Sequence, residues 1–179
     1  MAEIEHALEH DPLSPLFRAE QAVTRLYAKR YDEAAESCRR ALEIDPNFFI
    51  VIDCLAVVRC YQQRFEEALT LADQGVEIHG RRSRRLTLLG LVHALAGHIG
   101  EAHRVLDELL ELGSRDYVPA GRVAGIYAAL GEKDMAFEWA ERAVEQHDPM
   151  ILSVQADPVF HPLRSDSRYS ALLHEMNLG

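Results

Sequence analysis

The sequence has few cysteines, few basic residues and no long apolar run, and each shortage excludes a class of protein. Only three cysteines occur among 179 residues, with no CxxC pair, which excludes a disulfide framework and favours reduced thiols in a cytoplasmic compartment. The net charge of −10 argues against general nucleic-acid or membrane binding, because both require a positive field. The most apolar stretch, 48–58, contains Asp53 and is too short to span a bilayer. We therefore expect a soluble, cytoplasmic protein.

Motifs for catalysis and metal binding are also missing. His6 and His10 share one helical face at i, i+4 spacing, but the segment HALEH lacks the glutamate of the HExxH zinc motif, and no third ligand is near. We interpret this pair as a solvated helix face. Cys54 and Cys60 have no catalytic histidine beside them, and we interpret them as small buried hydrophobic residues. The sequence predicts a protein that is not an enzyme and has no cofactor and no metal.

The most informative feature that is present is a period of 34 residues. Small residues recur at this spacing in one column, Ala34, Ala68, Ala102 and Ala136. A second column keeps the same step at Ala7, Ala41, Gly75, Leu109 and Ala143. Self-similarity at a fixed period of this size marks a solenoid. Small residues at fixed places imply two short helices that pack closely against each other and against the next pair.

Helical periodicity is nearly continuous along the chain, and its breaks fall at proline and glycine. A first helix should end before Asp11-Pro12. The further helices are expected at 16–27, 31–44, 49–61, 65–78, 85–95, 100–112, 119–130 and 133–146. No segment shows the sustained alternation of a strand. The sequence thus predicts an all-α fold, a right-handed α-solenoid of antiparallel helix pairs.

The 34-residue unit resembles the tetratricopeptide repeat (TPR). The signature of this family is matched in the third unit by Leu86, Leu89-Gly90, His93, Gly97, Ala102 and Leu106, and in the fourth by Val123-Ala124, Tyr127, Gly131, Ala136, Ala140 and Ala143. The first two units match in their second helices, whereas Arg18 and Gln21 stand where the bulky and leucine positions fall. The resemblance implies a TPR-like superhelix with a half repeat over 1–12 and full repeats over 13–46, 47–80, 81–114 and 115–148.

Both ends of the sequence depart from the repeat. Residues 1–12 match only the second helix of a unit, so we expect either a longer array or a second chain that covers this edge. Over 149–179 we expect a linker and a C-terminal capping helix. Asp157-Pro158 and Pro162 predict a rigid link. Asp166 is the expected N-cap of a helix with an apolar stripe of Tyr169, Leu172, Leu173 and Met176.

The stretch 126–179 also resembles the C-terminal ends of bacterial multidomain signalling proteins. The segments YAALGEKDMAFEWAERAVEQHDP and DPVFHPLRSDSRYSALL carry this second resemblance. In such proteins a TPR tail follows a kinase, a nucleotide cyclase or a winged-helix DNA-binding domain. The resemblance implies a regulatory or interaction tail and assigns none of those effector activities to this chain.

In the TPR family, side chains of the first helices line a concave groove that receives a partner peptide. The resemblance places eight residues there: Val23, Asp53, Cys54, Val57, Thr87, Leu88, Leu91 and Arg122. The mostly apolar set favours an amphipathic helix or an apolar peptide anchor over a terminal carboxylate. The alternative is that this column packs against other helices of the same fold.

One basic cluster stands out in the acidic chain: Arg81, Arg82, Arg84 and Arg85. It is either a solvated loop or an anchor for an acidic or phosphorylated partner segment, because arginine forks match carboxylate and phosphate. The function predicted from the sequence is non-catalytic protein–protein interaction. Two alternatives remain open, a regulatory tail of a larger signalling protein and a homodimer formed through the N-terminal half repeat.

Overall fold

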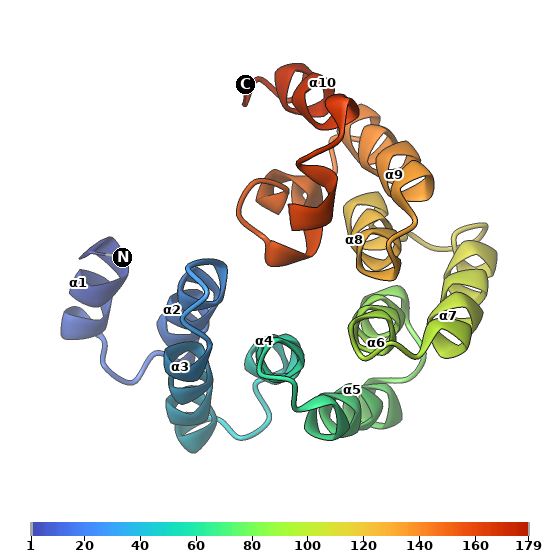
Figure 1. The fold of residues 1–179 in the computed structure, drawn as a ribbon. Coiled ribbons are helices and arrows are strands. Elements are labelled where there is room, and N and C mark those ends of the chain that lie inside the picture. The colour runs from blue at the N-terminus through green and yellow to red at the C-terminus, as the bar shows by residue number, and fades with distance from the viewer. Residues whose placement is uncertain (1, 179) are drawn as a thin grey trace. The chain divides into compact units, whose positions relative to one another are not determined.

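The computed structural model describes residues 2–178, and all the regular elements in that range are helices (Figure 1). After α1 (Ala2–His10) come four pairs: α2 (Pro15–Tyr27) with α3 (Tyr31–Ile44), α4 (Phe49–Tyr61) with α5 (Phe65–His79), α6 (Ser83–Leu95) with α7 (Ile99–Leu112), and α8 (Ala120–Leu130) with α9 (Lys133–Glu145). Two 3-10 helices, η1 (Pro149–Ser153) and η2 (Pro158–Leu163), precede α10 (Ser167–Glu175). The expected all-α fold of paired helices is confirmed.

The chain divides into two compact units, unit 1 (Met1–Gly80) and unit 2 (Arg81–Gly179). In unit 1, α2 packs against α3 and α4 against α5, and the first helices α2 and α4 also contact each other. Unit 2 repeats this arrangement with α6 against α7, α8 against α9, and α6 against α8. Within residues 2–178, no helix combines the length and the apolarity that crossing a bilayer needs.

The alanine column that revealed the repeat lies on the second helices of the pairs and is fully buried. Ala34, Ala68, Ala102 and Ala136 are all 0 % exposed. A methyl side chain at the crossing point lets two helices approach closely while still filling the space between them. The 34-residue period therefore records where each second helix meets its neighbours.

The turn inside each helix pair has the same backbone in all four repeats. Lys29, Gln63, Gly97 and Gly131 have positive φ angles of 59°, 62°, 78° and 79° and are 34 residues apart. Glycine adopts this left-handed conformation without strain, whereas lysine and glutamine adopt it only when the surroundings demand it. The turn geometry is thus set by the packing of the helices, even in the two repeats that lack glycine.

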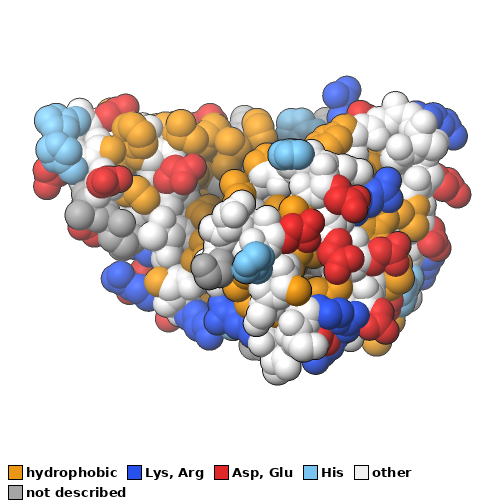
Figure 2. Space-filling model, turned by 90° about the horizontal axis from the view of Figure 1, so that it is seen from above, with side chains coloured by type: hydrophobic (Ala, Val, Ile, Leu, Met, Phe, Trp, Pro, Cys, Tyr) orange, Lys and Arg blue, Asp and Glu red, His pale blue; other side chains and the backbone are white. Residues whose placement is uncertain are grey.

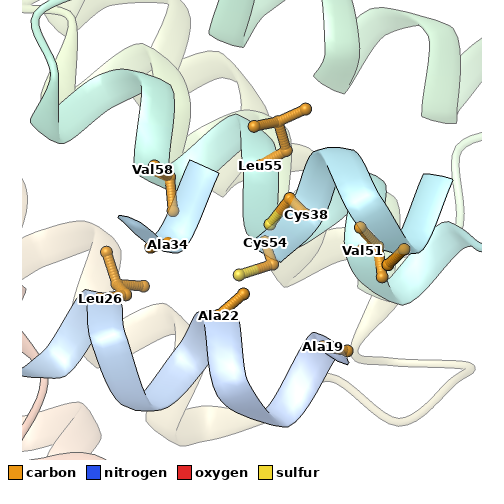
Figure 3. Close-up of a cluster of buried hydrophobic side chains, with 10 residues drawn as sticks. Ala19, Ala22, Leu26, Ala34, Cys38, Val51, Cys54, Leu55 and Val58 are labelled. Atoms are coloured by element: carbon orange, nitrogen blue, oxygen red, sulfur yellow. The ribbon is translucent and has the colours of Figure 1, made fainter. Parts of the chain in front are cut away.

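Figure 3 shows the core of unit 1, where α2, α3 and α4 meet. Cys38 and Cys54 come from different helices and lie among buried aliphatic side chains. All three cysteines are buried and free, as expected for Cys54 and Cys60 from their interpretation as small buried hydrophobic residues. A hydrogen bond to the Cys38 thiol, together with burial, raises the pKa of Cys54, and burial raises the pKa of Cys60 to about 12. Protonated thiols of this kind are poor nucleophiles.

Gln21, which stands where the repeat signature has leucine, takes part in a polar contact between α2 and α3. Gln21 and Ser37 are 8 % and 0 % exposed, and the Ser37 hydroxyl lies 3.0 Å from Gln21 Oε1 and 3.0 Å from the Glu33 carbonyl. Arg25 Nη1 donates to Ser37 Oγ at 2.6 Å. The corresponding positions of the next repeat are Leu55 and Leu71. A hydrogen-bonded pair therefore replaces an apolar pair, and both polar groups are satisfied.

We expect Ser37→Ala to lower the free energy of unfolding by about 1–3 kcal/mol, because it leaves the buried Gln21 amide and the Arg25 guanidinium without their shared partner. Chemical denaturation monitored by circular dichroism measures the change. Thr70→Ala is the matched control, since Thr70 makes the same hydroxyl contact to the carbonyl four residues earlier but is exposed. The control should stay within about 0.5 kcal/mol of the unsubstituted protein. Equal losses in the two variants would contradict a role for the buried network.

Candidate partner-binding surfaces

The first helices of unit 1 carry a half-exposed apolar strip, which we call the α2–α4 surface. It comprises Val23 and Tyr27 on α2 and Ile50, Val57 and Tyr61 on α4. Their spacings place the side chains of each helix on one face, and all five pack against the core cluster of unit 1 while remaining partly accessible. Figure 2 shows hydrophobic side chains at the surface of the molecule, with acidic side chains among them.

Acidic groups accompany this strip. Glu20 is exposed on α2, and the half-buried Asp53 lies on α4. Unit 1 has 15 acidic and 8 basic side chains, a net charge of −7. Several of its arginines are engaged in ion pairs on the second helices, such as Arg39 with Glu36 at 2.7 Å on α3. The potential around the α2–α4 surface therefore favours a basic rather than an acidic partner segment.

The eight side chains predicted to line the groove have different surroundings. Val23 and Val57 lie on the α2–α4 surface, Asp53 is half-buried beside it, and Arg122 on α8 is exposed. The other four are buried, with exposures of 8 % for Cys54, 6 % for Thr87, 8 % for Leu88 and 9 % for Leu91. Cys54 belongs to the unit 1 core (Figure 3). The two valines stay the best-placed members of the predicted set, and the sequence reasoning did not include Tyr27 and Tyr61.

In unit 2, a segment of the same chain lies against the first helix of the last pair. Both η1 and η2 contact α8, and Figure 1 shows these turns beside it before α10 begins. A Cβ atom on Gly121 would lie 2.8 Å from the Ile151 nitrogen and 3.0 Å from the Met150 carbonyl carbon. A Cβ atom on Gly125 would lie 3.7 Å from Val159 and Phe160 side-chain atoms. The two glycines thus create the space into which the segment fits.

A buried carboxylate fixes this contact. Asp148 is 3 % exposed, and its Oδ2 accepts the Gly121 N–H at 2.8 Å while its Oδ1 accepts the Met150 N–H at 2.9 Å. The first turn of α8 and the first turn of η1 therefore share one acceptor residue. Backbone N–H groups at the start of a helix are unsatisfied donors, so a buried carboxylate here is both hydrogen-bonded and favourably placed in the field of the helix.

The segment that the sequence predicts as a rigid link is therefore packed structure. Its signal is a spacing of nine residues: Asp148, Asp157 and Asp166 each accept the backbone N–H two residues later, at 2.9, 3.0 and 3.1 Å. Buried apolar residues follow at three and six residues after each aspartate, as Ile151 and Val154, Phe160 and Leu163, and Tyr169 and Leu172. The expected Asp166 N-cap is confirmed, and α10 packs against α9.

The four arginines of the basic cluster do not share one environment. Arg81 forms a two-pronged ion pair with Glu108, at 2.7 and 2.5 Å, and this guanidinium lowers the pKa of the Glu108 carboxyl. Arg85 is 4 % exposed, whereas Arg82 and Arg84 are exposed. A partner carboxylate or phosphate at Arg81 would have to replace an existing ion pair.

The histidine pair of α1 is a surface feature. His6 and His10 have exposed rings whose centroids are 4.6 Å apart, and Figure 2 shows histidine side chains at the edge where α1 lies. Within residues 2–178, no three histidine, cysteine or acidic side chains are grouped so that they could hold a metal ion.

Comparison with known proteins identifies the repeat directly. A family model described as tetratricopeptide repeat matches residues 20–48, which span the second half of α2, all of α3 and the turn into α4. A search of curated proteins finds no match. The match lies in the first repeat and includes Gln21 but not Arg18.

Gly121→Ala is expected to destabilise the protein by about 1–3 kcal/mol, because its methyl group would overlap the backbone of residues 150–151. Gly100→Ala is the matched control, since Gly100 is also helical but its Cβ atom would meet nothing within 4 Å. Loss of a glycine from a helix is otherwise favourable, so the control should gain up to about 1 kcal/mol. Thermal unfolding followed by circular dichroism compares the two. If Gly121→Ala were as stable as Gly100→Ala, the segment would not lie against α8.

Proposed function

Because the chain is a tetratricopeptide-repeat protein, a type of fold that is typically non-catalytic and generally mediates protein–protein interaction, we propose that it binds a protein partner through the α2–α4 surface. The observation that carries this proposal is the half-exposed strip that contains Val23, Val57 and Tyr61. These side chains lie on first helices, the helices that line partner grooves in this family. Apolar and aromatic side chains that remain accessible are the usual anchors of an interface.

The chemistry of the strip supports a particular class of partner segment. Its aliphatic and aromatic side chains suit the apolar face of an amphipathic helix or a short apolar peptide. Glu20 and Asp53 beside it, and the net charge of unit 1, favour basic residues on the flanks of that segment. Nucleic acid is disfavoured by the same charge.

The decisive substitution is Val57→Glu, which puts a charge at the centre of the strip. We expect it to weaken partner binding by at least about tenfold, as loss of a central apolar anchor does, while the far-ultraviolet circular dichroism stays unchanged. Peptides selected from a random phage-displayed library on the immobilised protein serve as probes. Fluorescence polarisation then compares their affinity for the two proteins.

The matched control is Ile78→Glu, since Ile78 is an apolar residue of unit 1 that is 69 % exposed on α5, away from the strip. This variant should bind the selected peptides as the unsubstituted protein does. Failure of the library to yield binders, or equal affinity for the Val57 variant, would contradict binding at the α2–α4 surface. Loss of helicity in the Val57 variant would show that this valine belongs to the core.

Self-association is a second candidate, favoured by two exposed leucines. Leu13 and Leu16, between α1 and the first turn of α2, are 70 % and 47 % exposed, and a second copy could cover them together with α1. Sedimentation equilibrium should then show a concentration-dependent dimer that Leu13→Asp abolishes. A monomer at all concentrations would exclude this candidate.

A regulatory role in a larger bacterial signalling protein is the third candidate, and it rests on the resemblance of residues 126–179 to such tails. It would use the same partner-binding surface, with the partner being a domain of the same polypeptide or its target. An immunoblot of source cells distinguishes a separate protein from a module of a larger polypeptide. A band near 20.2 kDa indicates a separate adaptor, and a much larger band indicates a module.

A further inference from the structure

We propose that α8 carries a docking surface for an Asp-Pro turn segment, and that residues 149–163 of the same chain occupy this surface permanently. This inference rests on the proposed function in one respect: the external partner binds unit 1, and α8 is not available to it. Gly121 and Gly125 of the last repeat correspond to Asp53 and Val57 of the second repeat, and in the last repeat this place is filled from within the protein.

The first argument is the closeness of the two backbones. Any side chain at Gly121 would have to displace the backbone of Met150 and Ile151, which approach to 3.0 Å or less of its Cβ position. The corresponding residues of the three earlier repeats are Ala19, Asp53 and Thr87, all of which have a Cβ atom. Only the last repeat is therefore shaped to receive a main chain at this place.

The second argument is the hydrogen bonding at the entry of the segment. Asp148 joins the Gly121 N–H to the Met150 N–H through its two oxygens, at 2.8 and 2.9 Å, and is itself 3 % exposed. A buried carboxylate that lost these two backbone donors would lose most of its compensation, which is strongly unfavourable. The aspartate of the Asp-Pro pair is therefore a recognition element as well as a helix cap.

The third argument is the burial of the side chains that follow. Six apolar residues of the segment are buried: Ile151, Val154, Pro158, Val159, Phe160 and Leu163. Leu152, which is 64 % exposed, is an apolar residue of η1 that faces water. A hydroxyl bond from Tyr169 to the Val154 carbonyl at 3.3 Å ties α10 to the same segment. Burial on this scale keeps the segment bound rather than in exchange.

The test uses the full-length chain and a fluorescent peptide with the sequence of residues 147–164. Phe160→Asp weakens the internal segment but leaves α8 unchanged, so this variant should bind the peptide. The unsubstituted protein should bind at least about tenfold more weakly, because its docking surface is almost never vacant. Leu152→Asp changes an exposed residue of the same segment and should behave like the unsubstituted protein. A peptide that itself has aspartate at the position of Phe160 should bind neither.

Equal binding of the peptide by the unsubstituted protein would overturn the proposal, as would a folded Phe160 variant that fails to bind. Hydrogen exchange on the unsubstituted protein decides the question if the variant does not fold. The Gly121 and Met150 amides should then exchange as slowly as the Ala124 amide inside α8, and fast exchange at Met150 would show that the segment opens. None of these readouts involves the α2–α4 surface, so a negative result here leaves the Val57 experiment to judge the proposed function.

Discussion

The close approach of the two helices within each pair is the constraint on which the rest of the structure depends. It favours small residues on the buried faces of the helices, such as the fully buried alanines at 34, 68, 102 and 136. It also requires the connecting turn to reverse the chain within a few residues, and a left-handed residue does this in every pair. Because the pairs within each unit contact each other through the same elements, the same solution can be repeated with different side chains elsewhere.

The helices could be predicted from the sequence because helix packing leaves a strong periodic signal. The alanine column marks fully buried positions of the second helices, and Asp-Pro and glycine mark most of the helix ends. The segment 149–163 could not be found in the same way, since its 3-10 turns lack the 3.6-residue period and its prolines suggest a linker. The three aspartates spaced nine residues apart can be seen in the sequence. They indicate a packed segment only once the residues that follow them are known to be buried.

The candidate site was predicted less completely than the fold, for a physical reason. An apolar residue on the inner side of a first helix has the same sequence pattern whether it faces a partner, another helix or a segment of its own chain. Val23 and Val57 remain partly accessible, whereas Leu88 and Leu91 are buried. At Gly121 the absence of a side chain is the only feature of the sequence that points to a close contact. The contact itself, with the backbone of residue 151, is visible only in the structure.

The hydrogen-bonded pair of Gln21 and Ser37 has a consequence for how the chain finds its fold. In an array of similar helices, a first helix could dock on the wrong second helix and form a compact but misassembled product. Paired with α5 or α7, Gln21 would face Leu71 or Val105, the residues that correspond to Ser37, and its amide would be buried without a partner. The Gln21–Ser37 contact can form only between α2 and α3. It therefore favours the correct pairing of α2 over pairing with the similar second helices of the other repeats.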